Sequence, residues 1–295
     1  MNHLSNSRQD KVFDAVNYIL LGILSLAVIY PLYYVLISSF SEPNIAGGSL
    51  LMLPKEFTLE GYSRIFADSS IWMGYRNTLM YTVLGTTINV VLTLTAGYAL
   101  SRRDLFGRNG FMFVIVFTMF FGGGLIPTYL LVKDLGMVNT IWAMVIPNAA
   151  SAYYIIITRT FFQTTIPGEV LESAQIDGTS DIRFFLQIAL PLSLPIVAVM
   201  TLFYTVNHWN SYFNALIYLK EHSIQPLQII LRNILISNDI SEMFVEEVHD
   251  LAEQRRLLEL MKFGVIVVSS LPVLVLYPFL QKYFVKGVMI GSLKE

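Results

Sequence analysis

Aromatic and amide side chains alternate along one stretch of the chain, from Tyr204 to Tyr218. Aromatic rings can stack on sugar rings, and amides can hydrogen-bond hydroxyl groups without the desolvation penalty of a buried charge. The stretch therefore has the chemistry of a path for a neutral polyol. The same side chains also suit packing between helices and anchoring at a membrane surface. The candidate residues are Tyr204, Asn207, Trp209, Asn210, Tyr212 and Asn214.

The polar interval before that stretch has the signals of two short helices around a turn. Pro167 and Glu169 favour a helix start, since proline suits the first turn and a carboxylate stabilises the positive end of the helix dipole. Gly178 favours the end of that helix, because glycine adopts the left-handed conformation without steric cost. Pro191 and Pro195 should end the second helix. We predict helices over about 168–176 and 181–190.

Small side chains beside an acidic one make the first of these helices a candidate docking surface. Glu172 should be exposed, and the small Ser173 and Ala174 would let a partner approach the backbone and pair with the carboxylate. Asp177 and Gly178 would shape the turn. An amphipathic connector that rests on lipid headgroups is the alternative interpretation.

Several classes of chemistry are absent from the sequence. There is no GxxxxGK[ST] phosphate loop, no HExxH and no GxSxG, so we expect neither nucleotide hydrolysis nor a catalytic centre in this chain. The chain has no cysteine, which excludes disulfides and thiolate metal sites, and we expect no metal or cofactor on it. A net charge of -2 without a polybasic block gives no nucleic-acid footprint.

The composition is that of a membrane protein. Hydrophobic residues make up 55% of the 295 and charged residues only 14%, against about 25% charged in soluble domains. After a short N-terminus, 1–14, we expect one transmembrane domain, 15–295, in which Asn77 caps the second helix. An apolar span needs roughly 20 residues. Six are predicted, at about 16–40, 77–101, 110–132, 139–161, 192–219 and 262–281.

Basic residues in short connections indicate which side of the membrane each loop occupies. The connection after the second span carries Arg102, Arg103 and Arg108, so it should be cytoplasmic. Both termini and the interval 162–191 then lie in the cytoplasm. The acidic segment 220–261 becomes an extracytoplasmic loop that we expect to contain some helix.

Few ionisable residues fall inside the predicted spans. Carriers driven by protons or sodium usually keep such groups at membrane depth, so the energy for transport should come from outside this chain. A lone His208 favours hydrogen-bonded packing over a proton relay. Prolines inside spans should kink their helices. These are Pro127, Pro147, Pro272 and Pro278.

The spacing in the cytoplasmic interval resembles the EAA motif of binding-protein-dependent ABC importer permeases. The matching residues are Glu172-Ser173-Ala174, Gly178 and Ile188-Ala189-Leu190-Pro191, with Ser173 in place of the usual first alanine. Four further stretches resemble carbohydrate-type permeases, above all the maltose-system second permease and the branch associated with lipoproteins and polysaccharides. They are Phe120 to Pro147, WNSYFNALIYL from Trp209, PLQIILRNIL from Pro226 and FVKGVMIGSLKE from Phe284.

This resemblance implies an all-α membrane protein with six transmembrane helices, the type I ABC importer permease fold with a cytoplasmic EAA helix-turn-helix. The EAA segment would couple to an ATPase through Glu172, Ser173, Ala174, Asp177, Gly178, Ile188, Leu190 and Pro191. The C-terminal tail would contact the same ATPase through Gly287, Gly291 and Lys294.

The implied function is inward transport of an oligosaccharide or sugar by alternating access in a bacterial plasma membrane. The implied partners are a second homologous permease, two ATPase subunits that hold ATP and Mg, and an extracytoplasmic sugar-binding protein that meets the outer loop near residues 225–236. The lipid bilayer surrounds the complex. The alternatives are a carrier or channel that acts alone, and an ABC permease for a solute other than a sugar.

Overall fold

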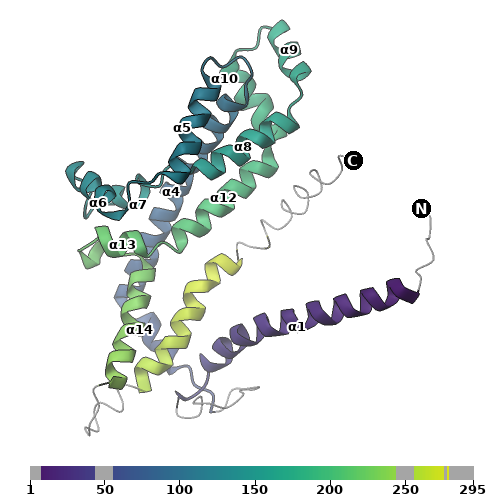
Figure 1. Cartoon of the computed structure of the whole chain (residues 1–295). Helices are drawn as coiled ribbons and strands as arrows, with labels where there is room; N and C mark the ends of the chain where they lie inside the picture. The colour runs from purple at the N-terminus through teal and green to yellow at the C-terminus, as the bar shows by residue number, and fades with distance from the viewer. Residues whose placement is uncertain (1–7, 44–55, 244–255, 276–277, 279–295) are drawn as a thin grey trace. The chain divides into compact units, whose positions relative to one another are not determined.

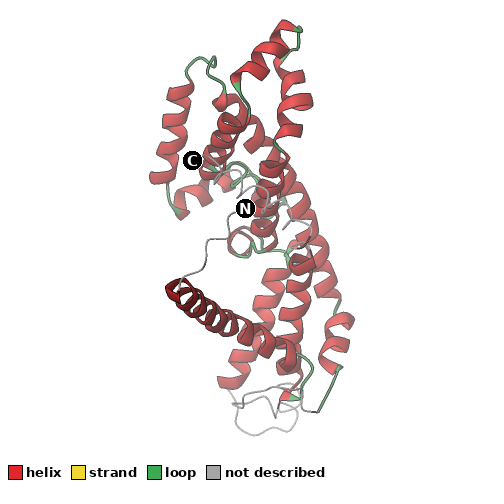
Figure 2. Cartoon of the chain, turned by 90° about the vertical axis from the view of Figure 1, so that its right-hand side faces the viewer, coloured by secondary structure: helices red, strands yellow, loops and turns green. Residues whose placement is uncertain are grey.

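The computed structural model describes residues 8–43, 56–243, 256–275 and 278. These residues are helical apart from turns, loops and one isolated β-bridge between Ser41 and Phe57 (Figures 1 and 2). The chain forms two compact units, which we describe separately. The first contains residues 1–68 and 233–270, and the second contains 69–232 and 271–295.

In the first unit, the end of α1 (Arg8–Ser38) meets α3 (Glu60–Ala67) and the helix Arg256–Val275. The guanidinium of Arg256 donates to the carboxylates of Glu42 and Glu60. Aromatic stacking reinforces this junction, because the Phe40 ring lies between those of Phe57 and Tyr62, at centroid distances of 5.7 and 5.1 Å. The long apolar helix α1 is therefore held at its C-terminal end.

The second unit is built on α4 (Ser69–Ser101), which packs against α8 (Ala152–Thr165) and α12 (Leu194–Trp209). Gly85 faces His208 of α12, and Gly97 faces Thr158 of α8. A Cβ at position 97 would lie 2.6 Å from the Thr158 methyl carbon. Small residues let helices approach closely where lipid provides no hydrophobic driving force. The remaining helices of this unit are α5 (Arg108–Phe120), α6 (Leu125–Asp134), α7 (Trp142–Val145) and α13 (Phe213–Tyr218), while α14 (Leu227–Met243) begins in it.

Three helices in the described residues are long and apolar enough to cross a membrane: Asp10–Ser38, Ser69–Ser101 and Arg256–Val275. The number rises to five if two bent pairs each count as one span. One pair is α5 with α6, bent by 115°, and the other is Asp181–Leu192 with α12, bent by 83°. The chain is an all-helical membrane protein with three to five such candidates.

Several predicted spans differ from the structure. The predicted span 110–132 is bent in the structure, because α5 ends at Phe120 and α6 starts after Gly124, whose φ is +81°. Three successive glycines favour such a break, since glycine loses the most backbone entropy in a helix. The predicted span 139–161 is split between α7 and α8 around Pro147, which lacks a backbone N–H.

Two other boundaries also move. The predicted span 192–219 ends early, because α12 stops at Trp209 and α13 starts after Tyr212. The prediction that Asn77 caps the second helix is wrong, since α4 begins at Ser69 and contains Arg76 as well. The segment 220–261, which the sequence predicts to be an outer loop, contains helix as expected, a short turn at His222–Ile224 and then α14.

Candidate functional site

The interval between α8 and α12 forms two short helices around a fixed turn (Figure 1). Helix α9 (Gly168–Ile176) ends in a Schellman motif, in which Thr179 N donates to Ala174 O at 2.9 Å and Gly178 N to Gln175 O at 3.0 Å. Gly178 has a φ of +75°, so the prediction of a left-handed glycine is confirmed.

The second helix begins at Asp181, as predicted, and runs two residues further than expected. It consists of α10 (Asp181–Phe184), a π-helical turn (Phe185–Ala189) and α11 (Leu190–Leu192), and it ends at Ser193 between the two prolines. The Ser180 side chain caps its start by accepting a hydrogen bond from Arg183 N at 3.4 Å. We call residues 168–192 the coupling segment.

The two faces of α9 differ. Ala174 is buried in an apolar cluster with Phe162, Phe184 and Ile196, so its side chain faces the interior and not the exposed side of α9. The reason is periodicity, because Val170, Leu171 and Ala174 share the inward face at spacings of three and four residues. Glu172 and Ser173 lie on the exposed face, and Ser173 Oγ donates to Glu169 O at 2.8 Å.

The exposed surface of the coupling segment also carries apolar side chains. Ile176 is 87% exposed and Ile182 is 74% exposed, on either side of the turn at Asp177 and Gly178. Farther along, Ile188 and Leu190 are half-buried, and Pro191 is exposed. Exposed isoleucines beside an acidic residue form a surface of the kind that binds a protein partner.

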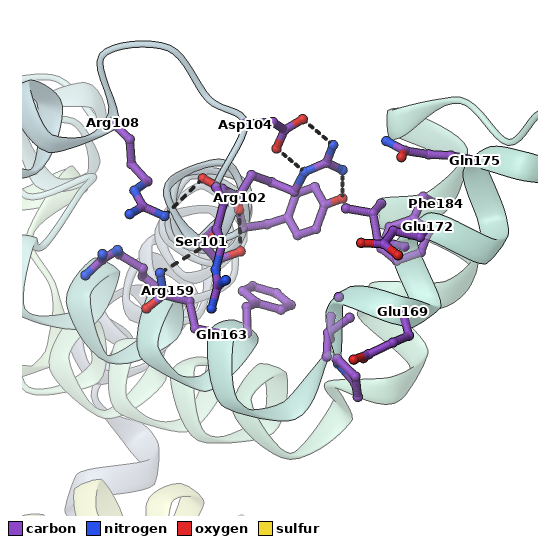
Figure 3. Close-up of a pocket in the computed structure, with 17 residues that line it drawn as sticks. Ser101, Arg102, Asp104, Arg108, Arg159, Gln163, Glu169, Glu172, Gln175 and Phe184 are labelled. Atoms are coloured by element: carbon purple, nitrogen blue, oxygen red, sulfur yellow. Dashed lines mark hydrogen bonds and ion pairs between the residues drawn. The ribbon is translucent and has the colours of Figure 1, made fainter.

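A hollow of about 810 Å³ separates α9 from the ends of α4 and α8 (Figure 3). Glu169 and Glu172 line its α9 side, whereas Arg108 and Arg159 line the opposite side. Arg159 Nε donates to Leu100 O at 3.1 Å, and Arg108 Nη1 to Arg102 O at 3.4 Å. Arg159 thus caps a carbonyl of the last turn of α4, and Arg108 bonds the carbonyl of the residue that follows the helix, so both complement the negative end of its dipole.

Arg102 also lines this hollow and contacts the second helix of the coupling segment. Its Nε and Nη2 donate to the two carboxylate oxygens of Asp104 at 2.8 and 2.6 Å, while Nη1 donates to Asp181 Oδ1 at 3.0 Å and to Tyr98 Oη at 3.1 Å. The bond from Arg102 lowers the pKa of the Asp104 carboxyl, and the same bond is the main cause of the raised pKa of Arg102.

The predicted sugar-contacting residues divide into two groups. Tyr204 and Trp209 are buried in helix packing, where the Tyr204 hydroxyl lies 2.6 Å from Thr93 Oγ1 and the Trp209 ring 6.1 Å from that of Tyr75. Asn207, Asn210 and Tyr212 are exposed, and Asn214 is half-buried. Asn207 is in the last turn of α12, and Asn210, the residue just after that helix, donates its amide nitrogen to Val206 O at 2.9 Å.

Comparison with known proteins decides the family. No model of a protein family matches the chain. It is 39% identical to Protein LplC of Bacillus subtilis over 292 residues, which are 99% of this chain and 98% of that protein. It is also 39% identical over 287 residues to the polygalacturonan/rhamnogalacturonan transport system permease protein YtcP of Bacillus subtilis, covering 97% of this chain and 99% of that protein. The chain belongs to the carbohydrate ABC importer permeases.

A solved structure agrees with this assignment. The fold matches a chain in the crystal structure of a bacterial ABC transporter involved in the import of the acidic polysaccharide alginate, with a TM-score of 0.84 at 33% identity. The match covers 94% of this chain and 98% of that chain. The protein is therefore a non-catalytic, multi-pass permease subunit of a binding-protein-dependent carbohydrate importer.

Sequence reasoning missed how this permease secures the segment around residues 223–227 to α4. Asn77 Nδ2 donates to the carbonyl oxygens of Ser223 at 2.9 Å and Gln225 at 3.0 Å, and Tyr81 Oη donates to Ile224 O at 2.6 Å. Leu227 N donates to Thr78 Oγ1 at 2.9 Å. The pairing joins residues about 150 positions apart, so no local pattern could reveal it.

The predicted tail contacts Gly287, Gly291 and Lys294 lie outside the described residues. Within the described residues, no group of three or more His, Asp or Glu side chains lies close enough together to hold a metal ion.

Proposed function

We propose that this permease has six spans and imports an oligosaccharide by alternating access. Two ATPase subunits that bind ATP and Mg would drive it, and a second homologous permease and an extracytoplasmic sugar-binding protein would complete the complex. It would lie in the bacterial plasma membrane with both termini in the cytoplasm. No cofactor would bind to this chain itself.

The coupling segment carries this proposal. Its turn has its carbonyls satisfied by the Schellman motif, so the two helices form a stiff unit rather than a loose connector. Glu172, Ile176 and Ile182 face outward from it. A stiff unit with an acidic and apolar outer surface suits docking in an ATPase cleft, where it would transmit motion. The alternative of a connector on lipid headgroups accounts less well for the exposed carboxylate.

The orientation rests on one contact. Arg102 belongs to the arginine-rich connection after α4 and is paired with Asp181 of the coupling segment. The two therefore lie at the same end of α4. The positive-inside rule then assigns both to the cytoplasm, where ATP is available.

The substrate class is supported by the relatives and by the exposed amides. One relative at 39% identity is named for polygalacturonan/rhamnogalacturonan transport, and the structural neighbour at 33% identity takes part in the import of alginate. Asn207 and Asn210 present exposed, neutral amide groups at the C-terminal end of α12. Oligosaccharides released from polysaccharides are the proposed cargo.

The test is coupled transport in proteoliposomes that contain the whole importer. Glu172→Lys reverses the docking charge, and Gly178→Val forces a β-branched residue to a φ of +75°. In both variants, sugar uptake per ATP hydrolysed should fall, whether or not the permease binds the ATPase less tightly. Asp134→Lys, an exposed acid on α6, is the matched control and should transport normally. Normal uptake by both coupling-segment variants would remove the docking role from this proposal.

A further inference from the structure

The proposed coupling segment can move the membrane helices only if it is fastened to one of them. Its first helix, α9, packs its inward face in the apolar cluster that contains Phe162 of α8, and it also borders the 810 Å³ hollow. Apolar packing of this kind has little directional preference. The second helix adds directional polar and aromatic contacts with the end of α4.

Two side chains at the C-terminal end of α4 contact the start of that second helix. Tyr98 lies in the last turn of α4, Arg102 is the residue that follows the helix, and Arg102 Nη1 donates to the Tyr98 hydroxyl at 3.1 Å. The Tyr98 ring lies 6.4 Å from the ring of Phe184 and 4.8 Å from that of Phe185, between centroids. Arg102 adds the ion pair to Asp181.

The arginine is held in one orientation by its other bonds. Asp104 accepts from two nitrogens of the guanidinium (Figure 3), and the planar fork then directs the remaining Nη1 at both Asp181 and the Tyr98 hydroxyl. The Arg102 side chain is only 12% exposed, while those of Asp104 and Asp181 are 63% and 73% exposed. A fixed cation therefore meets a carboxylate that approaches it from the coupling segment.

We propose that Arg102 is a positioning residue that locks the coupling segment to α4, so that movement of the docked segment is passed to the transport path. The inference rests on the proposed function and adds the contact through which movement of the coupling segment is passed to the helix bundle. Such an exposed pair contributes little to stability, since ion pairs in contact with water have small net energies. The ion pair instead fixes the position of the coupling segment relative to α4, because it joins residues that are 79 positions apart in the chain.

The experiment measures sugar uptake and ATP hydrolysis together in proteoliposomes that contain the complete importer. Arg102→Gln and Asp181→Asn should each keep ATP hydrolysis while uptake per ATP falls about fivefold or more, the range of ordinary allosteric coupling. Arg102→Lys should not restore coupling, because an ammonium cannot hold Asp104 with a bidentate fork and still reach Asp181. The double variant should be no worse than either single one. Arg103→Gln removes a charge from the adjacent exposed residue and is the matched control.

A chemical link distinguishes a lock from general stability. This chain has no cysteine, so Arg102→Cys with Asp181→Cys gives a unique pair of thiols within it. A short bifunctional thiol cross-linker should restore uptake per ATP to the uncoupled double variant, whereas capping the same thiols singly should not. Normal uptake per ATP in Arg102→Gln and Asp181→Asn, or no recovery on cross-linking, overturns the inference. If Glu172→Lys and Gly178→Val uncouple transport while these variants do not, only the lock is wrong. If none of the four variants uncouples, the proposed function of the segment fails as well.

Discussion

The Nε2 atom of His208 lies 2.9 Å from the side-chain oxygen of Asn89, and the Asn89 amide nitrogen donates to Asn148 O at 2.6 Å. One buried amide thus ties α12 to the backbone break between α7 and α8. Irregular backbone at membrane depth is tolerated only where its polar groups are satisfied within the protein or by a water-filled cavity. Asn89 supplies part of that satisfaction.

Replacement of Asn89 should therefore destabilise the permease. Asn89→Leu leaves the Asn148 carbonyl and the His208 ring without this partner, at a cost of about 1–3 kcal/mol for each buried polar group. The midpoint of thermal unfolding, measured in detergent by loss of the monodisperse peak, should fall by several degrees. Asn109→Leu, at an exposed position on α5, serves as the control and should leave the midpoint unchanged. Equal midpoints for both variants would show that the Asn89 bonds contribute nothing.

Gly85 should tolerate no larger residue while His208 is present. A Cβ at position 85 would overlap the imidazole ring of His208, so Gly85→Ala must displace that buried ring or push α4 and α12 apart. We expect a loss of about 1–3 kcal/mol, typical of overpacking. Adding His208→Ala to Gly85→Ala should recover part of the lost stability. Gly110→Ala is the control, because a Cβ there meets nothing within 4 Å, and it should leave stability unchanged. Thermal midpoints of the four proteins test this.

The lock at Arg102 should not respond to pH in the physiological range. Its bond to Asp104 lowers the pKa of that carboxyl from 3.8, so the stabilisation is present above the unfolded value and is lost only as the pH falls through the lower folded value. The difference in uptake per ATP between the parent protein and Asp104→Asn should be constant from about pH 5 to 8, well above these pKa values. Proteoliposome assays across that range test it, and a difference that changed near pH 6.5 would point to a histidine instead.

The two groups of sugar-path candidates should separate by assay. Asn207→Ala removes an exposed amide, so it should raise the substrate concentration for half-maximal uptake by about threefold to tenfold, the value of one hydrogen bond, and leave the thermal midpoint unchanged. Trp209→Ala empties a buried site beside Tyr75, so it should cost about 3–5 kcal/mol and lower the midpoint. If Asn207→Ala leaves uptake kinetics intact, that amide does not line the path.

The junction in the first unit should depend on Arg256. Arg256→Gln removes the cation shared by Glu42 and Glu60, and charged hydrogen bonds of this kind contribute about 1.5–3 kcal/mol. Protease sensitivity near the end of α1 should rise together with a lower midpoint. Arg64→Gln, whose ion pair with Glu60 is 4.0 Å long and largely exposed, should change neither. Equal sensitivity in the two variants would contradict the role of Arg256.

Local chemistry explains which predictions succeeded. Pro167, Glu169 and Gly178 specify where α9 starts and stops, because helix ends depend on groups within one turn of the chain. The apolar composition likewise specified a membrane protein, since no soluble core could bury so much apolar surface. These signals need no knowledge of the rest of the fold.

Other features depend on residues that are distant in sequence. The glycines at 122–124 permit a straight helix or a bend, and the structure adopts a bend of 115° between α5 and α6. Ala174 is small whichever side it faces, and only packing against Phe184 turns it inward. The sequence by itself therefore determined the membrane class, the family resemblance and the positions of the coupling helices. Tertiary structure alone decided which face is buried and that Arg102 meets Asp181, because those outcomes depend on contacts between segments that no local pattern encodes.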